Sequence, residues 1–225
     1  MQIVLLQNIM KKIIFAVLLV CVAGITAAGC IGTETPAGAV TPTPEVTQAS
    51  GNQTETAMNS SRILIAYFSR TGNTEAVARM IAEETGGTLF PVTTVESYPS
   101  DYTEATNVAR AEQEQNARPE LAVHVDAMEE YDVIFLGYPI WWGTMPMAMW
   151  TFLEEYDVTG KTIVPFCTHG GSGFGRSISD ITTLAPGATL RDGFACPGSS
   201  ARDAGDDMTA WVAGLNLSVH HTQFP

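Results

Sequence analysis

The most regular feature of the chain is an unbroken apolar run that leads into a short polar loop and then an amphipathic segment. Residues 63–68 are apolar, residues 69–74 are polar with a single glycine, and residues 75–84 carry apolar side chains at helical spacing. A continuous apolar run is typical of a strand in a sheet that helices cover on both faces. The pattern therefore predicts a buried strand, a loop and a helix that ends at Gly86.

Apolar runs and helical patterns alternate along the rest of the chain. Further strands are expected at residues 88–92, 131–138, 161–167 and 188–195, and further helices at 102–116, 145–155, 174–184 and 201–215. Pro91 suits an edge strand, and Pro165 weakens the prediction of the fourth strand. Regular alternation of strand and helix predicts an α/β fold, a doubly wound five-stranded parallel sheet with helices on both faces.

The first thirty residues have the pattern of a targeting segment. Two lysines precede an apolar core at residues 13–22, and small residues then lead to a cysteine. We expect residues 1–30 to be a lipoprotein-type signal peptide, with Cys30 as the lipidated first residue of the mature chain. An uncleaved membrane anchor is the alternative, because the apolar run from residue 13 to 31 approaches the length that spans a bilayer.

The next thirty residues, 31–60, are rich in Thr, Pro, Ser, Gly and Ala and have no apolar periodicity. Such a composition cannot bury a core and predicts a disordered linker. Residues 61–225 then remain as one folded domain. With either kind of leader, this domain is expected to lie outside the cytoplasm, anchored to the membrane.

The bulk composition narrows the possible functions. A formal net charge of −13 argues against a nucleic-acid partner, because phosphate backbones attract basic surfaces. The four cysteines show no metal-ligand spacing, and no metal site is expected. Outside the cytoplasm a disulfide between Cys167 and Cys196 is conceivable. Cysteines on neighbouring strands seldom have disulfide geometry, so two free buried thiols are favoured.

The polar loop after the first strand has the residues of an anion site. Ser69, Thr71, Asn73 and Thr74 supply side-chain donors, and the N–H groups at the start of a helix favour an anion. The loop has neither the lysine of the Walker pattern nor the three glycines of the dinucleotide fingerprint. The same residues would also serve as an ordinary helix cap, so the loop by itself leaves phosphate binding and capping both open.

Two further strands end in unusual loops. Residues 139–146 contain the adjacent pair Trp141 and Trp142, which could form an aromatic wall for a planar ring or pack the following helix. Neighbouring side chains point in different directions, so one of the two is expected to pack in the core. Residues 167–175 contain four glycines, which let backbone approach a ligand closely or simply give a flexible loop.

Taken together, these loops resemble those of the flavodoxin-like family over roughly residues 62 to 215. Residues 69–74 resemble its FMN-phosphate loop, although common flavodoxins have Ser or Thr where this chain has Arg70, which would place a cation beside the phosphate. Residues 139–145 resemble the Pro-x-x-aromatic-Gly-x-Met segment of FMN-dependent quinone reductases. The resemblance implies strand order 2-1-3-4-5, with the ligand at the carboxyl ends of the first, third and fourth strands.

The resemblance also implies FMN as the cofactor and a set of residues that hold it. Those residues are Ser69, Arg70, Thr71, Gly72, Asn73, Thr74, Pro139, Ile140, Trp141, Trp142, Gly143, Thr168, His169, Gly170, Gly171 and Gly173. Backbone N–H groups from Ile140 to Gly143 would face the N5/O4 edge of the flavin. His169 is a candidate proton donor to the flavin, or else an ordinary exposed loop histidine. No other catalytic residue is proposed from the sequence.

Three functions fit this pattern. The favoured one is a membrane-tethered FMN protein that transfers electrons to a redox partner protein or a quinone. The second is an NAD(P)H-dependent quinone or FMN reductase, which the segment at residues 139–145 favours. The third is a surface binding module that keeps the fold without flavin. A carrier should pass single electrons and oxidise little NAD(P)H, whereas a reductase should turn over NAD(P)H with a quinone. The redox partner and the oligomeric state are left unassigned.

Overall fold

The computed structural model describes residues 62–217, and the predicted signal peptide and linker lie outside the described residues. The strands are β1 (Ile63–Tyr67), β2 (Thr88–Pro91), β3 (Val133–Pro139), β4 (Thr162–His169), β5 (Thr189–Leu190) and β6 (Phe194–Pro197). The helices are α2 (Asn73–Thr85), α3 (Tyr102–Glu114), α4 (Met147–Glu155), α5 (Ser177–Leu184) and α6 (Gly205–Gly214), with short 3₁₀ helices η2 (Met128–Glu130) and η3 (Gly198–Asp203).

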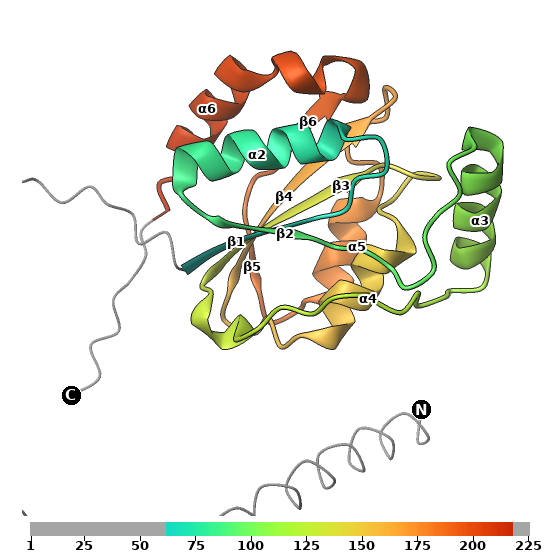
Figure 1. Ribbon diagram of the computed structural model, residues 1–225. Coiled ribbons are helices and arrows are strands. Elements are labelled where there is room, and N and C mark those ends of the chain that lie inside the picture. Colours follow the sequence, from blue (N-terminus) through green and yellow to red (C-terminus); the bar gives the residue numbers. More distant parts are fainter. Residues whose placement is uncertain (1–61, 218–225) are drawn as a thin grey trace, which may run out of the picture. The chain divides into compact units, whose positions relative to one another are not determined.

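The strands form one parallel sheet in the order β2-β1-β3-β4-β5, and β6 also pairs with β4. Helices α2 and α6 lie over one face, and α4 and α5 lie over the opposite face (Figure 1). The α/β fold and the strand order implied by the resemblance are therefore confirmed. The order places a topological switch point between β1 and β3, where ligands bind in open parallel sheets.

Each face of the sheet has its own hydrophobic core, and alternate residues of β1 enter the two cores. Leu64 and Ala66 pack with α4 and α5, whereas Ile63, Ile65 and Tyr67 pack with α2 and α6. All five of these side chains are buried. This explains why the strand is continuously apolar rather than alternating: neither face of the sheet is exposed to water here.

The fifth strand, expected as one segment at residues 188–195, is two short strands separated by a bulge. Strand β5 pairs with β4 as far as Ile163, and β6 pairs with β4 from Phe166 onward. Between these two pairings, two residues of β4 lie opposite the three residues that join β5 to β6. Pro165 lies in this gap and has no N–H to donate to a neighbouring strand. Gly193 fits here because a Cβ would lie 2.6 Å from the Pro165 carbonyl oxygen.

The last helix, expected at residues 201–215, is also divided, into η3 and α6. Buried Ala201 and Met208 face the same core from the two pieces, so the apolar spacing does not reveal the change of helix type. Two other helices begin later than expected. Pro146 has extended ψ and precedes the first residue of α4, and α5 begins only at Ser177 after the glycine-rich loop.

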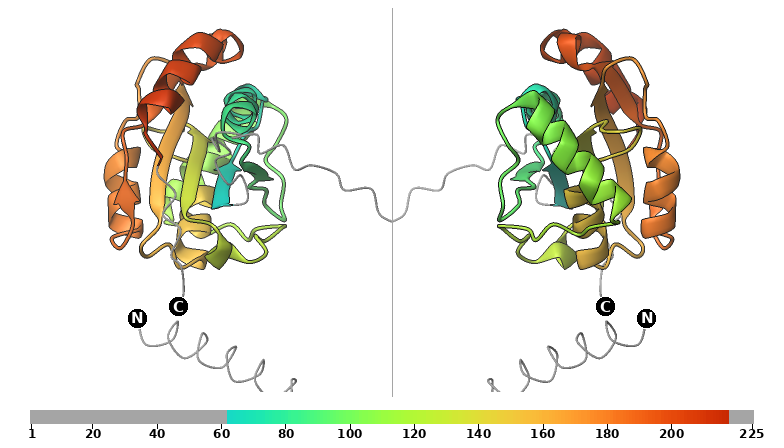
Figure 2. Two further views of the ribbon diagram at one scale, coloured as in Figure 1. Left: turned by 90° about the vertical axis from the view of Figure 1, so that its left-hand side faces the viewer. Right: turned by 90° about the vertical axis from the view of Figure 1, so that its right-hand side faces the viewer.

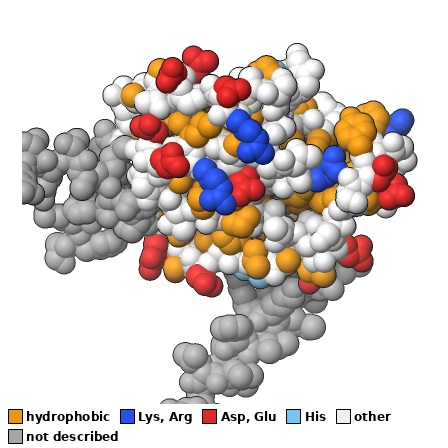
Figure 3. All heavy atoms as spheres, turned by 45° about the horizontal axis from the view of Figure 1, so that its top comes forward, with side chains coloured by type: hydrophobic (Ala, Val, Ile, Leu, Met, Phe, Trp, Pro, Cys, Tyr) orange, Lys and Arg blue, Asp and Glu red, His pale blue; other side chains and the backbone are white. Residues whose placement is uncertain are grey.

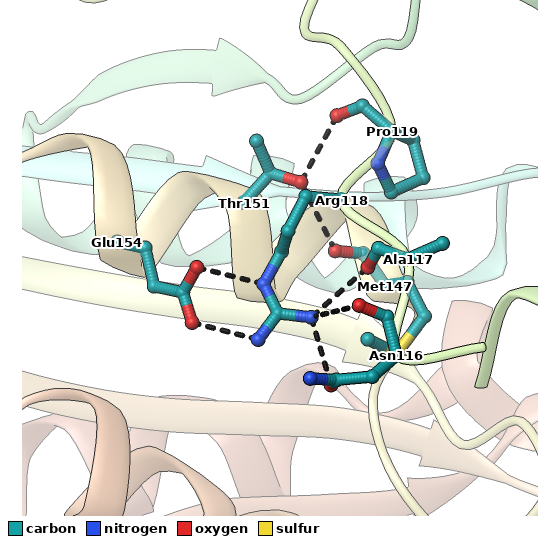
Figure 4. Close-up of polar contacts among 7 residues, drawn as sticks. All are labelled: Asn116, Ala117, Arg118, Pro119, Met147, Thr151 and Glu154. Carbon is teal, nitrogen blue, oxygen red and sulfur yellow. Dashed lines mark hydrogen bonds and ion pairs between the residues drawn. The ribbon is translucent and has the colours of Figure 1, made fainter. Parts of the chain in front are cut away.

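Helix α3 stands beside the carboxyl ends of the strands rather than over a face of the sheet (Figure 2). The segment after it is tied to α4 by Arg118, whose guanidinium makes two 2.7 Å hydrogen bonds to the Glu154 carboxylate (Figure 4). The same guanidinium donates to the Asn116 side chain and lies 5.0 Å from the Trp150 ring. These contacts fix the chain that follows α3, so the helix is anchored at its carboxyl end.

Cys167 and Cys196 are free thiols, as favoured from the sequence. Cys167 belongs to the core under α4 and α5, and Cys196 to the core under α2 and α6, so the sheet separates them. Burial raises the pKa of Cys167 to about 12, which keeps it a neutral thiol at physiological pH. Among residues 62–217, no helix is long and apolar enough to cross a membrane.

Candidate functional site

A cavity of about 320 Å³ lies at the carboxyl ends of β1, β3 and β4, at the expected switch point. It is lined by Ser69, Arg70, Thr71, Asn73, Thr74, Tyr102, Pro139, Ile140, Trp141, Thr168, His169, Gly170 and Gly198. Three loops distant in the sequence therefore meet around one hollow. Eleven of these thirteen residues are among the site residues expected from the sequence.

The loop after β1 presents unpaired polar groups to this cavity. Gly72 precedes α2 with a φ of 83°, and no side chain caps the first turn of the helix. The Ser69 hydroxyl oxygen is buried and has no hydrogen-bond partner in the described part of the chain. Open helix N–H groups together with an orphaned hydroxyl are the donors that an anion needs. The loop therefore fits a phosphate group rather than a self-contained helix cap.

Helix α2 and strand β4 are joined at the floor of the cavity. The hydroxyl oxygens of Thr74 and Thr168 are 2.9 Å apart and hydrogen-bonded, and both side chains are buried. Thr168 was expected as a hydroxyl ligand of the flavin, and it lines the cavity while bonding to Thr74. The bond fixes the start of α2, and hence its N–H groups, relative to the end of the sheet.

Arg70 lines the cavity but its guanidinium already has protein partners. Its Nη1 is 3.0 Å from the Ser100 carbonyl oxygen and 3.4 Å from that of Pro99, and its Cζ lies 5.9 Å from the centre of the Tyr102 ring. These contacts direct the cation toward the segment that leads into α3. Arg70 therefore links the phosphate loop to α3, and its contact with a phosphate stays a prediction.

The loop after β3 forms a tight turn at the rim of the cavity. The backbones of Trp141 and Thr144 exchange two hydrogen bonds, of 2.7 and 3.1 Å, and Trp142 and Gly143 between them have φ of 50° and 81°. The N–H of Ile140 donates to Thr168 and that of Trp141 to Thr144. Of the four N–H groups expected to face a flavin, those of Trp142 and Gly143 are the two not used in these bonds.

The two tryptophans have different surroundings. Trp141 is half-buried and meets Phe68 and Tyr98 edge to face, with ring centroids 5.3 and 5.1 Å away. Trp142 is 48% exposed, and its indole N–H donates to the Thr106 carbonyl oxygen. The expectation that one tryptophan packs in the core is met by Trp141, which lies against the core while lining the cavity.

A second hollow of about 210 Å³ continues the first one toward α3. It is lined by Arg70, Tyr102, Ala105, Thr106, Ala109, Ile140, Trp141 and Trp142, four of which also line the first cavity. Small alanine side chains on α3 leave the space, and the tryptophans and Tyr102 form its aromatic walls. The arrangement provides a polar end and a flat aromatic end within one continuous site.

The glycine-rich loop after β4 contributes His169 and Gly170 to the cavity, but Gly171 and Gly173 do not line it. His169 accepts a hydrogen bond through Nδ1 from the Gly171 N–H, at 2.9 Å. This bond holds the proton of neutral His169 on Nε2. Glycine is required at position 175, where this loop packs against the turn after β3, because a Cβ there would lie 2.3 Å from the Gly143 carbonyl oxygen.

Three parts of the site were not expected from the sequence. Tyr102 and the inner face of α3 come from a helix whose pattern is mainly polar, and Gly198 comes from the start of η3. A Cβ on Gly198 would lie 3.1 Å from the Asn73 side-chain nitrogen, so η3 packs tightly beside the phosphate loop. A tyrosine at the first position of a mainly polar helix was the one signal in the sequence.

The family is shown by comparison with known proteins. Residues 62–215 match the family model described as Flavodoxin, and the chain belongs to this family. A flavoprotein structure from Bacteroides eggerthii is 31% identical, with a TM-score of 0.59 over 70% of this chain and 99% of that one. A flavoprotein from Bacteroides uniformis is 30% identical, with a TM-score of 0.59 over 68% and 97% of the two chains.

Two more distant relatives have informative descriptions. A flavoprotein from Lactobacillus acidophilus, solved in complex with FMN, is 22% identical to this chain. The match has a TM-score of 0.55 and covers 66% of this chain and 99% of that one, which shows that the two share a fold. An NAD(P)H dehydrogenase (quinone) from Acidovorax ebreus is 29% identical over 98 residues, which are 42% of this chain and 46% of the relative. The match to this enzyme thus spans less than half of its length.

Proposed function

We propose that this protein binds FMN at the carboxyl edge of its sheet and transfers electrons through it. The observation that carries the proposal is the joining of an unpaired phosphate-type loop to an aromatic hollow within one continuous site. Membership of the Flavodoxin family and the fold shared with an FMN complex support the same cofactor. When bound, FMN supplies one- or two-electron redox chemistry.

The residues have distinct roles in this proposal. The N–H groups at the start of α2 and the hydroxyl of Ser69 bind the phosphate, and the Thr74–Thr168 bond keeps them in position. The ring lies toward Trp141 and Trp142, which line the aromatic hollow against α3. His169 presents its Nε2 proton, because Nδ1 already accepts from the chain, and so can donate to a polar edge of the ring.

We further propose that electron transfer takes place at the outer face of the membrane. The apolar leader that ends at Cys30 supports this location, through lipidation at that cysteine or through an uncleaved anchor. The partner is then a redox protein or a membrane quinone. A nucleic-acid partner is disfavoured by the net charge of −13.

A quinone or FMN reductase that uses NAD(P)H is the second candidate. The partial similarity to the Acidovorax ebreus dehydrogenase favours it. Nothing in this candidate changes the way the phosphate loop holds FMN. The two candidates differ only in whether the site also accepts a nicotinamide and delivers electrons in pairs.

Stepwise reduction of the FMN-loaded full chain, followed by absorption, tests the proposal and separates the candidates. Uptake of the two electrons at well-separated potentials, with negligible NAD(P)H oxidation, supports the carrier. Uptake of both electrons in a single step, together with turnover of NAD(P)H and a quinone, supports the reductase. A chain that retains no FMN after gel filtration, in either redox state, overturns both and leaves the flavin-free binding module.

A further inference from the structure

Arg202 is a cation beside the phosphate loop that the sequence pattern did not single out. It lies in η3, it is exposed, and its Nη2 is 3.3 Å from the position that a Cβ on Gly72 would occupy. Gly72 is the residue directly before α2, in the centre of the loop that binds phosphate in the proposed function. The absence of a side chain at Gly72 therefore lets a guanidinium approach the backbone of the loop.

Arg202 differs from the other cations of the described chain in having no partner of its own. Every other Lys or Arg side chain in residues 62–217 has an ion-pair or hydrogen-bond partner: Arg62, Arg70, Arg79, Arg110, Arg118, Lys161, Arg176 and Arg191. No hydrogen bond, ion pair or ring contact of Arg202 is found within the same residues. Arg202 and Arg79 line a separate surface hollow beside α2, which Gly72 borders and which adjoins the phosphate loop. The charge of Arg79 is held by Glu75 at 2.6 Å, whereas the charge of Arg202 is available to a ligand.

The segment that carries Arg202 is held firmly against the loop. Its neighbour Ala201 is completely buried against the core under α2 and α6, and Gly198 packs against the side chain of Asn73. The backbone of η3 is therefore placed by packing on both sides, while the arginine side chain is exposed. Figure 3 shows that, on the face toward the top of Figure 1, basic side chains lie nearer the middle than most of the acidic ones.

We propose that Arg202 is the cation that recognises the phosphate of FMN and lets the protein distinguish FMN from unphosphorylated riboflavin. The inference rests on the proposed function and adds a residue to it. A guanidinium matches the geometry of phosphate oxygens and forms charge-assisted hydrogen bonds with them. The sequence placed Arg70 as a cation beside the phosphate, but the guanidinium of Arg70 is bonded to two carbonyl oxygens on the side of α3.

The test compares the affinities of two ligands that differ only in the phosphate. Fluorescence titrations give the dissociation constants of FMN and of riboflavin for the full chain, its Arg202→Gln variant and an Arg110→Gln control. The control removes the same charge from α3, where Arg110 pairs with Glu114 and stacks on Trp142. Because Arg110 lies beside the aromatic hollow, its loss should affect both ligands equally. Thermal melting checks that each variant is folded.

Arg202→Gln is expected to lower the ratio of the riboflavin to the FMN dissociation constant about tenfold, as loss of one charge-assisted hydrogen bond predicts. The control is expected to leave this ratio unchanged, and added salt should reduce it more in the wild type than in Arg202→Gln. If the wild type prefers FMN and Arg202→Gln keeps the same preference, the role of Arg202 is wrong and the proposed function stands. If the wild type binds neither flavin, the proposed function fails and the inference with it.

Discussion

Thr74 and Thr168 join the start of α2 to the end of β4 through a hydrogen bond of 2.9 Å between their hydroxyl oxygens. Their exposed fractions are only 1% and 4%, so a hydroxyl that loses its partner has little access to water. The two residues are 94 positions apart in the sequence. Their contact couples the stability of the fold to the geometry of the proposed phosphate site.

Replacing Thr168 by Val should therefore destabilise the protein. The change keeps the shape of the side chain but leaves the Thr74 hydroxyl buried without a partner, which lowers the free energy of unfolding by about 1–2 kcal/mol. Urea denaturation followed by circular dichroism measures this. The double variant Thr74→Val/Thr168→Val should recover part of the loss, because it removes both polar groups. A single variant as stable as the wild type would show that the bond contributes nothing.

Ser69→Ala should have opposite effects on stability and on binding. In the flavin-free chain the Ser69 hydroxyl oxygen is buried and unpaired, so its removal leaves the free energy of unfolding unchanged or slightly higher. Loss of a hydroxyl donor to the phosphate should weaken FMN binding roughly tenfold. Thermal melts without flavin and FMN titrations measure the two effects. A loss of stability with no loss of affinity would contradict the assigned role.

The glycine-rich loop offers a pair of matched substitutions. Gly175→Ala places a Cβ 2.3 Å from the Gly143 carbonyl oxygen at a φ of 54°, and the resulting strain should cost about 1–3 kcal/mol of stability. Gly170→Ala is the control, because a Cβ there meets nothing within 4 Å. Parallel thermal melts compare the two. Equal melting temperatures would mean that the loop does not pack against the Trp141–Thr144 turn as described.

Glu112 on α3 should make stability depend on pH. Burial raises the pKa of its carboxyl, and the 2.7 Å hydrogen bond from the Tyr98 hydroxyl only partly offsets this. The folded state then binds the proton more tightly than the unfolded state. Its contribution to stability is present in full below the ordinary pKa of 4.5 and is lost as the pH rises through the raised value.

Melting temperatures from pH 4 upward, compared between the wild type and Glu112→Gln, measure this contribution. The variant should show a weaker decline across the window above pH 4.5, because its amide cannot ionise. Tyr98→Phe serves as the companion variant, since it removes the donor and should raise the pKa of Glu112 further. A decline of the same slope in the wild type and in Glu112→Gln would assign the pH dependence to other groups.

The sheet could be predicted from the sequence because its strands are buried on both faces. A run such as residues 63–68 has one physical explanation, and the alternation of such runs with helices leaves few topologies. The break between β5 and β6 could not be predicted, because it depends on Pro165 of a neighbouring strand. The division between η3 and α6 could not be predicted either, because buried residues of both pieces face the same core and keep a helical spacing.

The part of the candidate site that could be predicted is the part that a local sequence pattern encodes. Every residue of the loop at residues 69–74 except Gly72 lines the cavity. Their proposed role, binding a phosphate, follows from small donors placed directly before a helix. The roles of Tyr102 and Arg202 depend on how α3 and η3 pack against that loop, which no local pattern encodes. For Arg70 the local pattern was misleading. Its position in the motif suggested a phosphate ligand, but its guanidinium donates hydrogen bonds to the Pro99 and Ser100 carbonyl oxygens, about thirty residues away in the sequence.

The central claim is that the loop from Ser69 to Thr74 and the hollow beside Trp141 together bind one FMN. Titration of FMN with the purified full chain, followed by flavin fluorescence and absorption, tests this most directly. We expect saturable binding of one FMN per chain at micromolar or lower concentration, with a changed absorption envelope from the ring in its aromatic hollow. Fluorescence and absorption that stay those of free FMN throughout the titration would contradict the claim.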